Sequence, residues 1–114
     1  MIEMFQGSSF NTNIGNWDTT NVIRMDGMFG DNHAFNQDIS KWKTSNVKAM
    51  SWTFARSKKF NQDLSKWKTT NVEAMESMFV EAAAFNQDLS KWDTSKTTIM
   101  SSMFKNANSF NSGK

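Results

Sequence analysis

The sequence of 114 residues contains no cysteine, no proline and only five glycines. Without cysteine the chain has no disulfide framework, no thiolate zinc site and no redox pair. The lack of proline and the low glycine content exclude a collagen-like chain and a low-complexity disordered chain. Stability is therefore expected to come from side-chain packing.

Long hydrophobic runs and a strong charge excess are also missing. No window of 18 apolar residues occurs, so no membrane-spanning helix is predicted. Thirteen Lys and Arg stand against eleven Asp and Glu, a formal net charge of +2 with the two signs interspersed. This balance lacks the basic footprint of a nucleic-acid-binding protein, and we expect no nucleic-acid partner.

Catalytic groups are scarce as well. His33 is the single histidine, no thiol is present, and neither a Ser-His-acid constellation nor a glycine-rich phosphate loop can be assembled. The repeated aspartates described below share one environment, whereas acid and base roles need carboxylates with different pKa values. We expect no enzyme activity and no cofactor.

What the chain does contain is a repeat with a period of about 25 residues, and self-similarity at such a period indicates a repeat array. Three series carry it: Phe10, Phe35, Phe60, Phe85 and Phe110; Trp17, Trp42, Trp67 and Trp92; and Met25, Met50, Met75 and Met100. We expect one domain, residues 1–114, with about four and a half repeats. Because the chain begins and ends inside a repeat, we expect it to be excised from a larger protein.

One repeat suggests two short elements. Apolar residues at spacings of three and four in "NVEAMESMFVEAAA", Asn71 to Ala84, predict an amphipathic helix. The alternation in Asp63, Leu64 and Ser65 predicts a half-buried strand. The expected fold class is α/β: a right-handed solenoid of 25-residue repeats, with one short parallel strand and one short helix in each repeat.

The stretch "DISKWKTSNVKAMSWTFARSKKFNQDLSKW", Asp38 to Trp67, resembles a known family. The "FNQD[IL]SKW" and "MxxMF" elements recur together in a bacterial surface-protein repeat of the same period, found in mycoplasma lipoproteins and catalogued as domain of unknown function 285. The resemblance covers the whole chain. It implies a fold similar to a leucine-rich repeat, an exported protein anchored to the cell surface by lipid or wall attachment, and a role in recognition or adhesion without known catalytic residues.

Three columns of polar residues are the candidate binding residues. They are Asp38, Asp63 and Asp88; Ser40, Ser65 and Ser90; and Lys41, Lys66 and Lys91. Stacked carboxylates need backbone N–H groups, lysines or a cation such as calcium as partners. We favour solvated or structural carboxylates over a metal site. The lysines are able to bind sulfated sugars or anionic surfaces, or instead to neutralise the aspartates.

Other positions admit a structural interpretation. An asparagine column is expected to serve the backbone of its own turn: Asn11, Asn36, Asn61, Asn86 and Asn111. Asp31 and Arg56 place opposite charges on neighbouring repeats, which suggests register control. Trp52 lies outside the repeated columns, and it either forms a contact surface or, as we favour, fills space beside Thr53.

The combined expectation is a non-enzymatic recognition or adhesion module on a bacterial cell surface, binding a protein or a glycan through an extended face. The alternative is a structural or antigenic spacer without a defined ligand. Exposed ends of a repeat stack also predict end-to-end self-association of this chain.

Overall fold

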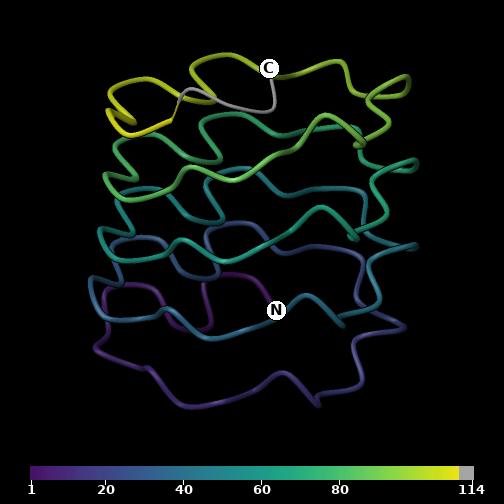
Figure 1. Cartoon of the computed structure of the whole chain (residues 1–114). Coiled ribbons are helices and arrows are strands. Elements are labelled where there is room, and N and C mark those ends of the chain that lie inside the picture. Colours follow the sequence, from purple (N-terminus) through teal and green to yellow (C-terminus); the bar gives the residue numbers. More distant parts are fainter. Residues whose placement is uncertain (111–114) are drawn as a thin grey trace.

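The computed structural model describes residues 1–110 of the chain. The backbone winds as a pile of similar loops, each lying on the one before it (Figure 1). We divide it into five layers that follow the sequence: residues 1–24, 25–49, 50–74, 75–99 and 100–110. The body measures 32 × 30 × 20 Å and has a radius of gyration of 12.5 Å, so it is compact in all three directions.

Secondary structure of the ordinary kind is almost absent. Residues 1–110 contain no helix and no strand longer than an isolated bridge. Three parallel bridges join successive layers: Arg24 to Ala49, Ala49 to Ala74 and Ala74 to Ile99. The predicted α/β solenoid with a strand and a helix in each repeat, and its likeness to a leucine-rich repeat, is therefore wrong.

The predicted helix at Asn71 to Ala84 is replaced by a run of turns over residues 76–81. Two residues of that run, Ser77 and Glu81, have left-handed backbone with φ of 52° and 54°. Their equivalents in layer 3, Trp52 and Arg56, have φ of 64° and 56°. A left-handed residue at every fourth position cannot continue a right-handed helix.

Alternate amides in this run donate to the next layer instead of to their own turn. The N–H groups of Ser77, Phe79 and Glu81 donate to carbonyl oxygens of layer 5, at distances of 2.8 to 2.9 Å. The same ladder joins the earlier layers, with donors at Gly27, Phe29 and Asp31 and at Trp52, Phe54 and Arg56. The bonds that a helix would form internally are thus used to hold one layer on another.

The spacing of the layers explains why no helix forms. The ring centroids of Phe29 and Phe54 lie 5.5 Å apart, as do those of Phe54 and Phe79. On another side of the body Trp42 and Trp67 are 6.3 Å apart. Helices pack at about 8–10 Å between axes. Helices stacked layer on layer would separate these rings beyond the roughly 4.5–7 Å at which aromatic pairs are favourable.

The predicted strand at Asp63 to Ser65 leads into a turn at 65–66. The N–H of Trp67 donates to the carbonyl of Leu64 at 3.1 Å, and the N–H of Ser65 donates to Oδ1 of Asp63 at 2.8 Å. An aspartate that bonds the backbone two residues ahead favours a turn over an extended chain. The bridge of this layer lies at Ala74, inside the segment that the spacing assigned to a helix.

The core is a continuous double column of phenylalanine rings with a tryptophan column beside it. Phe54 stacks on Phe60 within its layer at 4.1 Å and on Phe79 in the next layer at 5.5 Å. The interior phenylalanines are fully buried, and Trp42 and Trp67 are only 4% and 2% exposed. Each buried side chain of this size contributes about 1.5–3 kcal/mol before the loss of entropy is counted.

Polar groups inside the body are paired between layers. The indole N–H of Trp67 donates to the carbonyl of Ile39 at 2.9 Å. Oγ1 of the buried Thr44 donates to the carbonyl of Lys68 and accepts its N–H, both at 2.9 Å. Among the described residues no buried side-chain nitrogen or oxygen lacks a partner. These bonds fix the register of each layer on the next.

Candidate functional site

The predicted aspartates each brace a turn. Oδ1 of Asp38 accepts the N–H of Ser40 at 2.9 Å, and the pairs Asp63–Ser65 and Asp88–Ser90 repeat this bond at 2.8 and 2.9 Å. In layer 1, Asn13 replaces the aspartate and its Oδ1 accepts the N–H of Gly15 at 2.9 Å. The Asp and Ser columns therefore form one structural unit in each layer.

These bonds also tune the carboxyl groups. The backbone N–H of Ser40, followed by its hydroxyl, lowers the pKa of Asp38. The same two groups of Ser65 lower the pKa of Asp63, and at Asp88 the hydroxyl of Ser90 leads. Nearby lysines lower these pKa values further. The column is thus fully ionised near neutral pH.

The predicted lysines lie exposed along the same edge of the stack. In residues 1–110 the ion pairs within 4 Å are Arg24–Asp26 and Arg56–Asp31. Lys41, Lys66 and Lys91 take part in neither, so their ammonium groups attract the aspartates only from a distance. The lysines offset the negative charge of the aspartates at this edge. Their ammonium groups also remain available to donate hydrogen bonds to a ligand.

Two of these lysines line a groove of about 540 Å³ across layers 3 and 4. Lys68, Ser65 and Thr70 also line this groove. Asp93 is part of the lining too, and its carboxylate accepts the N–H of Ser95 at 2.9 Å. Three ammonium groups and two hydroxyl groups suit an anion with several oxygens. Asp63 and Asp88 lie outside this lining.

The ladder of asparagines has a different role from the predicted one. Oδ1 of Asn11 accepts the N–H of Asn36 in the next layer at 2.9 Å. Oδ1 of Asn36 accepts the N–H of Asn61 at the same distance. Nε2 of Gln37 donates to the carbonyl and to Oδ1 of Asn11. The asparagines bind the layers to one another, and Asn111 lies outside the described residues.

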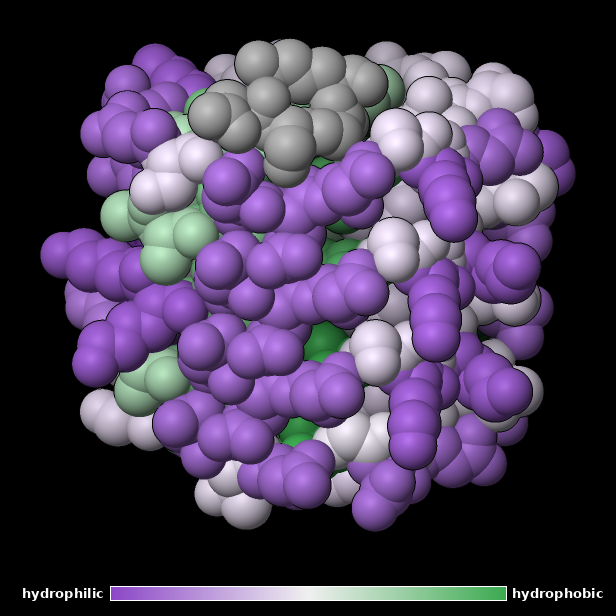
Figure 2. Space-filling view, in the orientation of Figure 1, coloured by the Kyte–Doolittle hydropathy of each residue, from purple (hydrophilic) through white to green (hydrophobic). Residues whose placement is uncertain are grey.

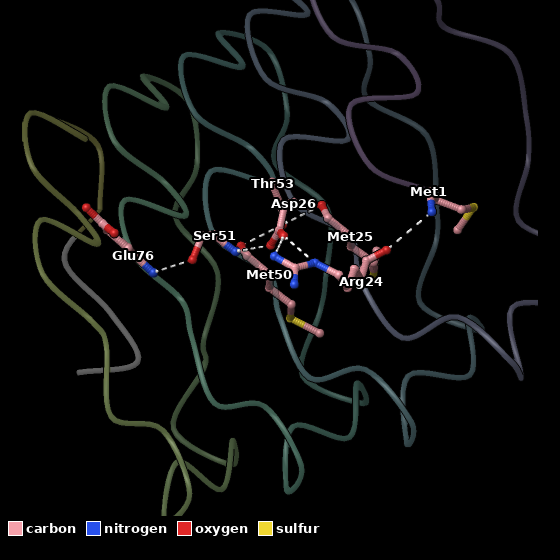
Figure 3. A network of polar contacts seen from close by, with 8 residues as sticks. All are labelled: Met1, Arg24, Met25, Asp26, Met50, Ser51, Thr53 and Glu76. Carbon is pink, nitrogen blue, oxygen red and sulfur yellow. Dashed lines mark hydrogen bonds and ion pairs between the residues drawn. The ribbon is translucent and has the colours of Figure 1, made fainter.

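A second polar network lies where the runs of turns of layers 2, 3 and 4 begin, at Asp26, Ser51 and Glu76 (Figure 3). Glu76 donates its N–H to Oγ of Ser51, and Ser51 donates its N–H to Oδ1 of Asp26. Arg24 pairs with the other oxygen of Asp26, and the carbonyl of Arg24 accepts from the N-terminal ammonium of Met1. These contacts connect four successive layers. The charges of Arg24 and Asp26 therefore help to hold the layers together.

The structure adds a hollow that the sequence did not indicate. It has a volume of about 270 Å³, and its lining includes Glu3, Gly27, Gly30, Trp52 and Arg56. A Cβ added at Gly27 would lie 3.1 Å from Cγ of Glu3, so the side chain of Glu3 packs against the bare backbone of this glycine. Trp52 is 40% exposed and lies under the guanidinium of Arg56, 5.9 Å from the ring centroid. Trp52 is therefore a surface residue that is covered in part by Arg56.

The charge pair predicted between neighbouring repeats is formed. Nε of Arg56 lies 2.6 Å from Oδ1 of Asp31, and this bond lowers the pKa of Asp31 and raises that of Arg56. Thr53, beside which Trp52 was expected to fill space, is buried and donates to the carbonyl groups of Met25 and Met50. The hydroxyl of Thr53 is therefore satisfied by backbone carbonyl groups inside the body.

One face of the stack is mostly hydrophilic. Hydrophilic side chains cover the face in Figure 2 in regular rows, with hydrophobic atoms visible in narrow gaps between them. Within residues 1–110 no three His, Cys, Asp or Glu side chains come together in a way that suits a metal ion. The described part of the chain also holds no helix long and apolar enough to cross a bilayer.

Comparison with known proteins gives one finding. A family model described as "Mycoplasma protein of unknown function, DUF285" matches residues 1–113. No curated protein and no solved structure matches the chain at a significant level.

Proposed function

Because the chain belongs to the family of mycoplasma proteins of unknown function called DUF285, we propose a function from its surface: a non-enzymatic recognition module that binds a protein or a glycan. The ligand is expected to carry negative charge, as a sulfated or carboxylated sugar chain does, or as an acidic protein surface does. This proposal places the protein on the outside of the cell, held there by a lipid or wall anchor of the larger protein.

The lysine-rich groove is the observation that supports the proposal. Lys66, Lys68 and Lys91 line it without an ion pair within 4 Å in the described structure. The exposed Lys41 and Lys43 occupy the corresponding positions in layer 2. Repetition at each layer provides several weak contacts for an extended polyanion, and linked contacts of this kind raise the overall affinity.

The direct test is binding to immobilised sulfated glycans and to host-cell proteins at several salt concentrations. The Lys66→Gln and Lys91→Gln double variant is expected to lose about tenfold or more in affinity, since each charge-assisted bond contributes about 1.5–3 kcal/mol when it is desolvated. Lys58→Gln with Lys59→Gln is the matched control, because these exposed lysines lie outside the groove and remove the same charge.

The competing interpretation is a spacer that sets distance from the membrane and has no ligand. Uniformity along the stack favours it, because the Asp, Ser and Lys columns vary little from layer to layer. Background signal from both the glycan array and the protein pull-down would support the spacer. Binding that the groove variant and the control variant lose equally would show attraction by net charge without a site.

A further inference from the structure

The hollow beside Trp52 lies where the repeat is broken. One position of the repeat carries Glu3, Gly27 and Trp52 in layers 1, 2 and 3. Layer 2 has a second glycine, Gly30, at the position that Val80 fills in layer 4. The wall of the hollow therefore consists of glycine backbone in layer 2, with a carboxylate contributed by layer 1 and an indole by layer 3.

Trp52 occupies a position that suits glycine. Its backbone is left-handed with φ of 64°, and that of Gly27 has φ of 63°. A bulky side chain is disfavoured in this conformation, whereas glycine adopts it readily. The ring of Trp52 is also 40% exposed, so it gains less from burial than the interior tryptophans do. A strained residue with an exposed aromatic ring at the wall of a hollow points to a binding role.

Layer 1 contributes one acceptor group and one amide to the hollow. A Cβ built on Gly27 would lie 3.8 Å from Oε2 of Glu3, and one built on Gly30 would lie 3.7 Å from Nε2 of Gln6. The carboxylate and the amide therefore stand beside the bare backbone of layer 2. Within residues 1–110 neither side chain has a hydrogen-bond or ion-pair partner. Both groups are thus available to a ligand in the hollow.

Layer 3 contributes donors that are held in place. Nε and Nη2 of Arg56 donate to the two carboxylate oxygens of Asp31 at 2.6 and 3.1 Å. A guanidinium has further N–H groups, which remain to serve a ligand. Asp26 and Ser51 also line the hollow, but they already bond each other (Figure 3). The hollow therefore combines an aromatic surface with both donors and acceptors of hydrogen bonds.

We propose that the hollow binds one pyranose ring of a neutral sugar. A pyranose carries C–H groups on its faces, which pack on the indole of Trp52, and hydroxyl groups around its rim. Each hydroxyl both donates and accepts hydrogen bonds, so the rim suits the carboxylate of Glu3 and the guanidinium of Arg56 together. Pockets for drug-sized ligands measure about 300–1,000 Å³. A hollow of about 270 Å³ therefore suits a smaller group such as one sugar ring.

The charges of the lining favour a neutral ligand over an ion. Asp26 and Arg56 each have an ion-pair partner, which leaves Glu3 as the unpaired charge of the lining within residues 1–110. An anion in the hollow would lie against the carboxylate of Glu3. A cation would lie against the guanidinium of Arg56, whose carbon is already 5.9 Å from the ring centroid of Trp52. A ring that carries hydroxyl groups meets both charged groups favourably.

This sugar site is separate from the lysine-rich groove, and the two linings share no residue. Binding in the groove depends on the attraction of exposed charges, so it weakens as the salt concentration rises. Stacking and hydrogen bonds to a neutral sugar depend little on salt. The two sites can therefore be tested independently, and either proposal can fail without the other.

NMR titration of the unmodified protein with neutral methyl glycosides tests the proposal. The panel contains methyl glucoside, galactoside, mannoside and N-acetylglucosaminide, each added to about 50 mM. At least one is expected to shift the indole N–H of Trp52 and the amides of Gly27 and Gly30 in a saturable way, with a dissociation constant of about 1–10 mM. High salt is expected to leave these shifts unchanged, as is the Lys66→Gln and Lys91→Gln double variant.

Two variants introduce residue types that layer 4 already holds at the equivalent positions. Trp52→Ser follows Ser77 and removes the stacking surface, and Gly30→Val follows Val80 and fills the hollow. Both are expected to fold, and each is expected to weaken sugar binding by about tenfold or more. Ile23→Ser is the control: Ile23 is 55% exposed and lies outside the lining of the hollow, so its loss should leave sugar binding unchanged.

Three results would overturn the proposal. The first is the absence of a saturable shift at Trp52, Gly27 and Gly30 with every glycoside of the panel. The second is full retention of sugar binding by both variants. The third is a saturable shift with tetramethylammonium ion but with no glycoside, which would identify a cation site. If the variants do not fold, the unmodified protein decides: shifts confined to the lining support the site, and shifts spread over the surface contradict it.

Discussion

Interior and end layers carry the same residue types in the same order, yet they are buried to very different degrees. Trp42 and Trp67 are 4% and 2% exposed, whereas Trp17 in the first layer is 42% exposed. Within one loop these tryptophans are equivalent. The difference arises because an interior ring has a layer on each side and an end ring has one. Burial in this protein is therefore a property of neighbouring layers and not of the single repeat.

The tryptophan column gives the largest expected contrast. Trp67→Ala removes a buried ring and leaves the carbonyl of Ile39 without its indole donor. It is expected to reduce the free energy of unfolding by about 3–5 kcal/mol. Trp17→Ala removes a ring that is already 42% exposed, and a loss of about 1 kcal/mol is expected. Urea unfolding of both variants measures the contrast, and equal losses would refute it.

The threonine column gives a smaller contrast that isolates hydrogen bonding. Thr44→Val keeps the shape of the side chain but leaves both the N–H and the carbonyl of Lys68 without their partner. A loss of about 1–3 kcal/mol is expected. Thr94 is exposed and its hydroxyl bonds no later layer within the described residues, so Thr94→Val should stay within about 0.5 kcal/mol. Comparable losses would show that the bridging hydroxyl contributes little.

Much of this arrangement follows from the sequence. The repeat period identifies Phe, Trp and Met as the repeated core residues, and the charge order at Asp31 and Arg56 predicts their pairing between layers. The family resemblance is confirmed by the match over residues 1–113. These inferences succeed because they depend on which side chains recur, and recurrence is visible without knowing the backbone.

The backbone conformation of the repeat could not be predicted from the sequence in the same way. Apolar spacings of three and four fit a helix, but they fit equally a run of turns in which Met75, Met78 and Phe79 also point inward. Local propensity does not include the distance between layers, which the stacked rings set at 5.5 Å. A usable signal was present in the column of Gly27, Trp52 and Ser77, where a glycine marks left-handed backbone.

The left-handed positions provide a test of that backbone. Trp52 has φ of 64°, a conformation that costs a bulky residue about 1–2 kcal/mol and costs glycine little. Trp52→Gly loses partly exposed contacts and relieves this strain, so the free energy of unfolding should change by less than about 1 kcal/mol. Phe54→Gly, two residues away, loses a fully buried ring and should be far more damaging. A large loss from Trp52→Gly would argue against the left-handed conformation.

Acid provides the smallest expected effect. The pKa values of Asp38, Asp63 and Asp88 are lower in the folded chain than the ordinary value of 3.8. Below that pH the unfolded chain binds more protons than the folded chain, so stability falls as pH decreases from about 4 and is unaffected above it. Because the aspartates are exposed, the loss is modest.

The triple variant with asparagine in place of Asp38, Asp63 and Asp88 tests this acid effect, because it removes the three carboxyl groups and keeps the acceptor oxygen of each turn. Asn13 already makes the equivalent bond to Gly15 without a charge, so the triple variant should fold and keep its turns. Its melting temperature should depend less on pH between 4 and 2 than that of the unmodified protein. An unchanged acid dependence would assign the effect to other carboxylates.

Amide hydrogen exchange in dilute protein tests the layered ladder most directly. The N–H groups of Trp52, Phe54 and Arg56 donate to layer 4, whereas those of Ser102, Phe104 and Asn106 have no acceptor in the described chain. Slow exchange is expected for the first set, and exchange close to that of an open chain is expected for the second. Equal protection of the two sets in dilute protein would contradict it.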